Sequence, residues 1–239
     1  MTISKPVLIS NTPNPDDVII KSSIMYHFQC SEQEAKQIME ESEKIDPEYK
    51  AKSMNIILHK EERRELEQVS FTFQIPISLS ILTHLTRHRM HSLLIPEFTP
   101  LWDFNNFIIP ATIQAKSELK NIFINAQKEN MKIFEEFKNS NVSDEDLIYF
   151  YLGCQMLNVV TTMNGRTLQW ILHLRCCNKA QWQIRNIAKE LAKQVSSVAP
   201  LLGKGLGPTC MTDLVCYEGK ECCGLINSLL ENRTVEKIK

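Results

Sequence analysis

Two arginines and two histidines stand within five residues of this chain, in the run Arg87-His88-Arg89-Met90-His91. Arginine presents a rigid fork of N–H donors that fits phosphate and carboxylate groups, and histidine exchanges a proton near neutral pH. Because the run follows an apolar stretch, a solvated basic helix end that complements the helix dipole is the alternative explanation. A second arginine-rich segment far downstream favours an anion site.

That second segment covers residues 164–175 and continues as Ala180-Gln181-Trp182-Gln183-Ile184-Arg185. Arg166 and His173 are seven residues apart, so they would share one face of a helix with Trp170 between them. An arginine beside an aromatic ring can stack on a planar ligand, which contributes about 0.5–2 kcal/mol. An amphipathic helix with a polar rim is the alternative, but the two segments together favour a ligand site.

The composition narrows the class of protein. The 239 residues carry a net charge of −1 and are 43% hydrophobic, which is enough for one large domain or a domain with an appendage. Without a global positive field, we expect no nucleic-acid partner. The chain has no apolar run of membrane-spanning length and no apolar signal region, so we expect no membrane partner and a cytoplasmic location. Its eight cysteines then indicate thiols or metal ligands more than disulfides.

The expected fold class is α+β, with helices dominant and a smaller sheet. Alternating apolar residues predict a half-buried strand over residues 69–75, and a capping box at Ser31 and Glu34 predicts a helix to about residue 44. Pro76 is expected to open a helix that ends at the arginine–histidine run. The other expected elements are two strands, at 17–20 and 24–29, and four helices, at 54–67, 111–138, 143–175 (capped by Ser143) and 178–200 (capped by Asn178).

Both arginine-rich segments resemble those of the flavin-dependent thymidylate synthases. The family signature is Arg-His-Arg, seven further residues and Ser, preceded by a strand close to Ser-Phe-Thr-Phe; here these are Arg87-His88-Arg89 and Ser70-Phe71-Thr72-Phe73. The family's Asn-x-Arg, Leu-Arg and Ala-Gln-Trp-x-Ile-Arg stand at residues 164–166, 174–175 and 180–185. The resemblance covers roughly residues 60–200 and keeps the order and spacing of the motifs.

The signature is altered in the segment that meets the substrate phosphate in the family. Glu97 stands where the family has its serine, Thr99 where it has a phosphate-binding arginine, and Ile95 where it has Glu or Gln. His84 replaces a glutamine three residues before the first signature arginine. Since a carboxylate repels a phosphate, either His84, His91 or another base supplies the phosphate site, or the substrate is not deoxyuridine monophosphate (dUMP).

The resemblance implies a homotetramer with an α+β fold, a mostly antiparallel sheet and flavin sites where subunits meet. In the family reaction, NADPH reduces FAD, methylenetetrahydrofolate gives a methylene group to C5 of dUMP, and the flavin supplies the hydride that completes dTMP. By position, the resemblance assigns FAD contacts to Glu67, Arg87, His88, Arg89, Asn164, Arg166 and Trp170. It assigns the nucleotide to His84, Ser92, Glu97 and Arg175, with Arg175 as the catalytic residue.

Two other functions fit the same residues. A related enzyme would transfer a one-carbon group to C5 of another pyrimidine nucleotide, for example by hydroxymethylation, which the altered residues 95–99 favour. A protein that binds flavin or nucleotide without catalysis is the second alternative, because Glu97 and Thr99 depart from the family pattern. Glu67 itself is either a flavin-site residue or a carboxylate at a helix end.

Residues 203–239 are expected to form a Gly/Cys-rich C-terminal tail beyond a catalytic domain of residues 1–202. Five of the seven glycines lie between 203 and 224, and the tail resembles that of some family members from anaerobic bacteria. Four thiols can make a tetrahedral zinc site, but the spacing is not Cys-x-x-Cys, so no metal is assigned. The thiols in question are Cys210, Cys216, Cys222 and Cys223. A loop of reduced thiols at a subunit edge is the alternative, and Cys176 and Cys177 are expected to pack at a helix end.

Overall fold

A computed structural model describes residues 5–97 and 105–236, and the side chains of α12 only as far as residue 231. The chain forms two compact units. The described part of the first unit comprises residues 75–87, 93–97 and 105–160, and that of the second comprises 5–74, 88–92 and 161–236. Among the described residues, no helix is both long and apolar enough to cross a membrane.

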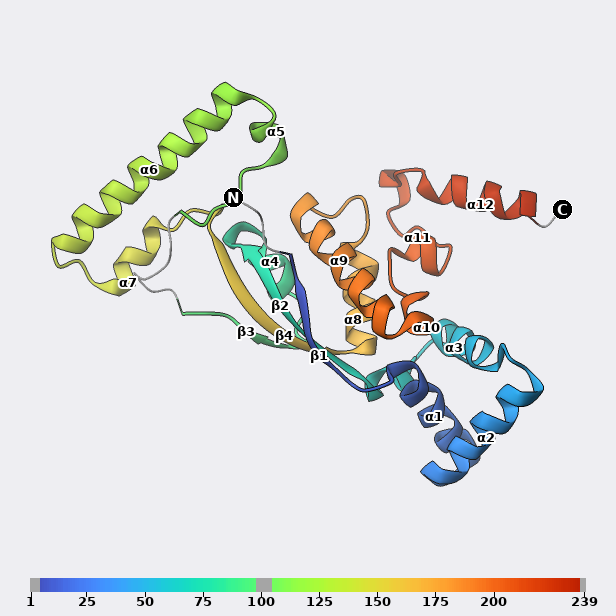
Figure 1. Cartoon of the computed structure of the whole chain (residues 1–239). Coiled ribbons are helices and arrows are strands. Elements are labelled where there is room, and N and C mark those ends of the chain that lie inside the picture. Colours follow the sequence, from blue (N-terminus) through green and yellow to red (C-terminus); the bar gives the residue numbers. More distant parts are fainter. Residues whose placement is uncertain (1–4, 98–104, 237–239) are drawn as a thin grey trace. The chain divides into compact units, whose positions relative to one another are not determined.

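One four-stranded antiparallel sheet has the order β1-β2-β4-β3 (Figure 1). Its strands are β1 (Val7–Asn11), β2 (Ser70–Ser78), β3 (Ser92–Leu94) and β4 (Met156–Asn164). β1 runs antiparallel to β2, and a bulge between Leu8 and Ser10 shifts their register. With many helices around a small antiparallel sheet, the predicted α+β class is confirmed.

Strand β2 confirms the predicted alternation and extends it. Phe71 and Phe73 are fully buried, whereas Ser70 and Gln74 are exposed, as expected of a strand with one face in the core. The expected helix start at Pro76 is wrong, because this proline is buried inside strand β2. Proline has no backbone N–H, so it donates no hydrogen bond to a neighbouring strand at this position.

In the first unit, β2 passes directly into helix α4 (Leu79–Thr86). The backbone N–H groups of Leu79 and Ser80 donate to the carbonyl oxygens of Gln155 and Gly153, at 3.0 and 2.9 Å. α4 buries Ile81, Leu82 and Leu85. The helix ends at the first signature arginine, as predicted.

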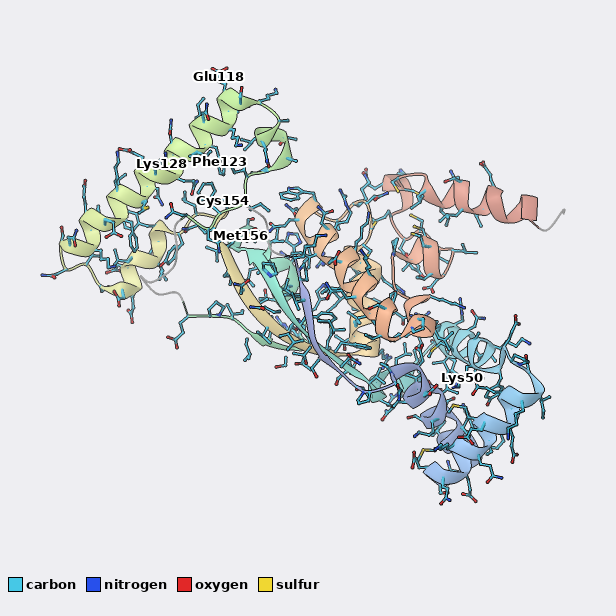
Figure 2. All side chains as sticks on the ribbon, viewed as in Figure 1. Lys50, Glu118, Phe123, Lys128, Cys154 and Met156 are labelled. Atoms are coloured by element: carbon cyan, nitrogen blue, oxygen red, sulfur yellow. The ribbon has the colours of Figure 1, made fainter. Side chains whose placement is uncertain are left out.

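The rest of the first unit is built around a long helix, α6 (Ser117–Asn139), which follows the single turn α5 (Ala111–Gln114). The single helix expected over 111–138 is therefore wrong; the chain is extended at Lys116, and no glycine or proline marks the break. α6 lies beside α7 (Asp144–Leu147) in Figure 1, and Phe134 and Leu147 form their shared core. Phe123 of α6, labelled in Figure 2, packs against Phe107 with ring centroids 6.1 Å apart.

The helix expected over residues 143–175 is also wrong. Ser143 does act as a cap, accepting the N–H of Asp146, but α7 has only four residues and a 3-10 turn (Ile148–Phe150) follows it. Strand β4 comes next, and its residues Leu157, Val159, Thr161 and Met163 are buried in alternation with more exposed neighbours. β-Branched residues at 159–162 favour the strand because their side chains crowd a helix.

In the second unit, β1 is followed by three helices, α1 (Pro15–Phe28), α2 (Glu32–Ile45) and α3 (Tyr49–His59). The two strands expected over 17–29 are wrong, because Pro15 in the first turn and two aspartates after it start a helix that buries Ile19, Ile20 and Ile24. The predicted capping box at Ser31 is confirmed. Lys50 of α3, labelled in Figure 2, pairs with carboxylates of α1 and α2, Asp17 at 2.9 Å and Glu43 at 3.1 Å.

After α3 the expected helix over 54–67 is interrupted. Its last turn is the separate 3-10 helix η1 (Arg64–Gln68), and Arg63 between the two is left-handed, with φ 51°. Further on, α8 (Gly165–Arg175) and α9 (Trp182–Val198) lie side by side (Figure 1). The predicted cap of the last long helix at Asn178 is wrong, since the side chain of Gln181 accepts the N–H groups of Gln183 and Ile184.

The C-terminal tail follows the short helix α10 (Pro200–Gly203) and contains α11 (Thr209–Thr212), the 3-10 turn η3 (Gly219–Glu221) and α12 (Leu225–Glu236). It contacts two buried polar side chains of α8. Gln169 donates to the Gly205 carbonyl at 3.2 Å, and Thr212 hydrogen-bonds His173 at 3.2 Å. Arg63 donates to Gln169 at 3.0 Å and pairs with Asp213 of the tail at 3.6 Å.

Candidate functional site

The start of α8 is fixed against the residues that precede β2. Asn164 is its N-cap, since its side-chain oxygen accepts the N–H of Thr167 at 2.8 Å. Gly165 donates its N–H to Val69 O at 3.0 Å, and a Cβ at this position would lie only 2.7 Å from Leu66 O. A glycine is therefore required for this close approach, which places the second residue of α8 beside Glu67.

Glu67 and Arg166 form an ion pair of 2.5 Å between Oε1 and Nη1. The side chains are 35% and 42% exposed, so water screens the pair and its contribution to stability is about 0–1 kcal/mol. Its effect is to orient the guanidinium at a helix N-terminus, where the dipole already favours negative charge. Trp170 follows four residues later and is 61% exposed, which presents an aromatic ring near this arginine.

At the other end of α8, Arg175 donates from Nε to Nε2 of His88 at 3.1 Å. Burial lowers the pKa of His88 to about 4, with further lowering by the positive charge of Arg175 and by His91. His88 is therefore neutral at physiological pH. Because its Nε2 accepts a hydrogen bond, its ring proton lies on Nδ1.

The residues after His88 are tied to β4 and α8 by two threonines. Thr161 donates to Ser92 O at 2.8 Å, and its oxygen lies 2.6 Å from Nδ1 of His91, so that nitrogen is the donor. Thr167 donates to Met90 O at 3.3 Å. Residues 88–92 thus have their path fixed by backbone contacts, which holds the imidazole of His88 against Arg175.

Of the residues predicted for the site, the second unit brings together Glu67 with Arg166 and His88 with Arg175. Arg89 and Ser92 are exposed in the same segment. In the first unit, His84 is half-buried on α4, Arg87 is exposed at the end of that helix, and Glu97 is exposed after β3. Thr99, where the family has its phosphate-binding arginine, lies outside the described residues.

Sequence reasoning missed Thr161 and Thr167, which position the signature run. The Asn164 cap accounts for the backbone N–H of Thr167, but no local signal predicts that its hydroxyl donates to Met90 O. Thr161 could be found only by recognising β4 as a strand, since its role follows from facing residues 91 and 92 across the sheet.

The tail cysteines meet a further thiol that was not expected there. A cavity of about 380 Å³ is lined by thiols of the α8 end and of the tail, together with apolar and polar neighbours; the thiols are Cys176, Cys177, Cys210, Cys216, Cys222 and Cys223. Burial raises the pKa of Cys176 to about 12, which agrees with the predicted packing role. Cys177 instead faces the tail, where its thiol lies 3.5 Å from Oε1 of Glu218.

Comparison with known proteins identifies the family. Residues 7–201 match the family model described as thymidylate synthase complementing protein. The chain belongs to the flavin-dependent thymidylate synthase family. A flavin-dependent thymidylate synthase of Clostridium tetani is 32% identical over 240 residues, covering 92% of this chain and 93% of the relative. One of Geobacter sulfurreducens is 28% identical over 224 residues, with 92% and 94% covered.

A solved structure supports the fold. The UMP/dUMP methylase PolB of Streptomyces cacaoi, bound with 5-Br dUMP, superposes with a TM-score of 0.68 over 84% of this chain and 93% of that one. At 14% identity this similarity establishes the fold alone. The predicted family is confirmed, and the chain is an enzyme of the methyltransferase type.

Proposed function

We propose that this enzyme catalyses the reductive methylation of dUMP to dTMP, with methylenetetrahydrofolate as the carbon donor, NADPH as the reductant and FAD as the flavin. The observation that carries the proposal is the pair of His88 and Arg175, which joins the signature run to the downstream arginine of the family motif. Family membership and the relatives named flavin-dependent support the same reaction.

The donor set of the chain fits a flavin dinucleotide. Arginines suit its two phosphates, and Arg166 is pre-oriented by Glu67 at a helix start. An exposed indole at Trp170 offers a face to a planar ring. We assign the flavin to Glu67, Arg87, His88, Arg89, Asn164, Arg166 and Trp170; of these, Asn164 also caps α8. When bound, FAD supplies the hydride of the reaction.

Arg175 is the residue to which we assign activation of the pyrimidine. A guanidinium beside a ring carbonyl stabilises the negative charge that develops on its oxygen, typically by a few kcal/mol. Neutral His88 accepts the Nε–H of Arg175 without adding a second charge. The imidazole thereby holds the direction of the guanidinium without neutralising its charge.

We assign the nucleotide to His84, Ser92 and Glu97 in addition to Arg175. Glu97 is the reason for considering a second substrate, because its exposed carboxylate stands where the family has serine. A carboxylate repels phosphate but accepts hydrogen bonds from sugar hydroxyl groups. A pyrimidine nucleotide other than dUMP, receiving a one-carbon group at C5, is therefore the alternative substrate.

The proposal includes the wider setting of the enzyme. We infer a cytoplasmic homotetramer, with residues 1–202 as the catalytic domain and residues 203–239 as an appended tail. The family model ends at residue 201, close to this boundary, which supports the division.

The test is anaerobic turnover of the purified, FAD-loaded protein with NADPH and methylenetetrahydrofolate, with dUMP and UMP offered in parallel and products detected by mass. Replacement of one hydrogen by a methyl group, a mass gain of CH2, on dUMP alone supports the proposal, and the Arg175→Ala protein serves as the blank. A modified UMP product would transfer the proposal to the alternative substrate. Turnover of neither nucleotide by flavin-loaded protein would contradict both.

A further inference from the structure

The C-terminal tail is ordered without a core of its own. Of residues 208–231, all of which the structure describes, none is buried. Gly219 and Gly224 adopt left-handed conformations, with φ 53° and 82°, and produce the turns on either side of Cys222 and Cys223. Small segments that cannot bury apolar surface usually depend on a disulfide or a metal ion for their structure.

Polar contacts, one of them to a sulfur atom, hold this tail against the residues that follow α8. The side-chain amide of Asn178 donates to the sulfur of Cys223 at 3.6 Å, and Lys179 pairs with Glu221 at 2.7 Å. Cys216 and Cys222 line the same cavity and lie within electrostatic range of each other. Segments from three places in the sequence, at 177, 210 and 216–223, therefore present thiols to one cavity of about 380 Å³.

Four of these thiols form the closest-knit set. Cys210 lies within electrostatic range of Cys177, Cys216 and Cys223, and Cys177 lies within range of Cys216 and Cys223. Cys222 is not among the neighbours of Cys177 or Cys210. Cys177, Cys210, Cys216 and Cys223 are thus the four that share neighbours.

We propose that Cys177, Cys210, Cys216 and Cys223 bind one zinc ion that fastens the tail to the end of α8. Four thiolates at about 2.3 Å in a tetrahedron are the usual structural zinc site. In the described part of the chain, no three His, Cys, Asp or Glu side chains lie close enough together to hold a metal ion without moving. Zinc would draw the thiols inward, and this costs no core packing because the loop that carries three of them buries no residue.

Binding is coordination without redox chemistry. Each of the four thiols releases a proton to solvent, and each sulfur donates an electron pair to the ion. The ion takes no part in turnover, so the inference stands apart from the proposed reaction. Its structural effect falls on Arg175, because Cys177 is only two residues further along the chain.

The test is zinc content by mass spectrometry of the full-length protein, purified under reducing conditions and exchanged into metal-free buffer. We expect about one zinc per chain in the unmodified protein, from the single tetrathiolate site. Cys177→Ser and Cys210→Ser should each lower the zinc content at least tenfold, whereas Cys30→Ser, which changes a thiol on a separate segment, should leave it unchanged. Cobalt added to the zinc-free protein should give the intense visible bands of a tetrahedral thiolate site, and these should be absent from Cys177→Ser.

Circular dichroism and flavin occupancy establish that each variant is folded, and neither readout depends on turnover. Unmodified protein that binds neither zinc nor cobalt would overturn the proposal, as would full zinc retention by Cys177→Ser. A disulfide between tail cysteines in place of a metal, detected by mass under non-reducing conditions, would also overturn it.

Discussion

The Nε of Arg175 and the Nε2 of His88 are joined by a hydrogen bond of 3.1 Å, although the two residues are 87 positions apart in the chain. The bond requires an imidazole without a positive charge, because a doubly protonated ring has no acceptor to offer. Burial, together with Arg175 and His91 nearby, lowers the pKa of His88 and so keeps its ring neutral. The arginine and the histidine therefore depend on each other for orientation.

The pKa of His88 is directly measurable. We expect an NMR titration, with the resonance assigned through His88→Gln, to show a neutral ring down to about pH 4, against 6.5 for an unperturbed histidine. The same titration in denaturant provides the control, since the unfolded chain should titrate near about 6.5. A folded-state pKa at or above 6.5 would contradict the buried, arginine-facing position.

The same shift makes folding stability depend on pH. Between pH 6.5 and about 4 the unfolded chain binds a proton at His88 that the folded chain does not. Stability contributed by this residue is therefore fully present above pH 6.5 and decreases as pH falls through that window. Urea unfolding at several pH values should show a shallower pH dependence for His88→Gln than for the unmodified protein; equal slopes would contradict the prediction.

Arg175→Ala tests the assignment of the activating residue. We expect turnover to fall by at least about 10²-fold, as for the loss of an oxyanion donor, while flavin stays bound. The measurement is single-turnover product formation at saturating nucleotide. Arg64→Ala, which removes an arginine whose side chain is 72% exposed, is the matched control and should retain activity. Near-normal turnover by Arg175→Ala would show that the assignment by position is wrong.

Arg166→Ala should weaken flavin binding without unfolding the protein. The ion pair with Glu67 is partly exposed, so its loss should change the free energy of unfolding by no more than about 1 kcal/mol. Flavin occupancy after dialysis, read from the flavin absorbance, should fall at least about tenfold if the guanidinium contacts the flavin phosphates, the equivalent of about 1.4 kcal/mol. Glu67→Gln should show a smaller loss of flavin, and unchanged occupancy in Arg166→Ala would count against the role.

Gly165→Ala should destabilise the fold by about 1–3 kcal/mol, the usual cost of forcing atoms into a filled space. The new methyl group would meet Leu66 O at 2.7 Å, a backbone atom that cannot move without displacing the entry to β2. Gly153→Ala is a milder comparison, since its Cβ would meet the Ser80 Cβ at 3.3 Å. Chemical denaturation of both variants measures the difference, and equal stabilities would contradict the steric argument.

The sequence allowed prediction where a local pattern has one physical meaning. The alternation from Val69 to Ile75 and the capping box at Ser31 each specify a single backbone conformation, and both are present. The family motifs contain the residues of two observed pairs, Glu67 with Arg166 and His88 with Arg175, because the order of the motifs along the chain is preserved. How Arg175 meets His88 depended on packing, which no local pattern encodes.

Each wrong prediction has a physical reason. Strand β4 falls inside the helix expected over 143–175, because the cap at Ser143 marks where a helix starts but not where it ends, and the β-branched residues at 159–162 favour a strand. The strands expected within 17–29 are a helix, because Pro15 and the two aspartates after it mark a helix start that outweighs the strand preference of isoleucine. Cys177 could not be placed with the tail thiols at all, since only tertiary structure brings residues 177 and 218 together.

The contacts between the tail and α8 bear on how much of the C-terminus can be removed from the folded protein. Gln169 and His173 are 2% and 7% exposed, and both take partners from residues beyond the family boundary, at Gly205 and Thr212. Proteolytic cleavage near residue 202 would therefore remove one hydrogen-bond partner from each of these two buried side chains, and leaving a buried polar atom unsatisfied costs about 1–3 kcal/mol. The tail therefore contributes to the stability of the helix that ends in Arg175, and removing it should loosen that helix.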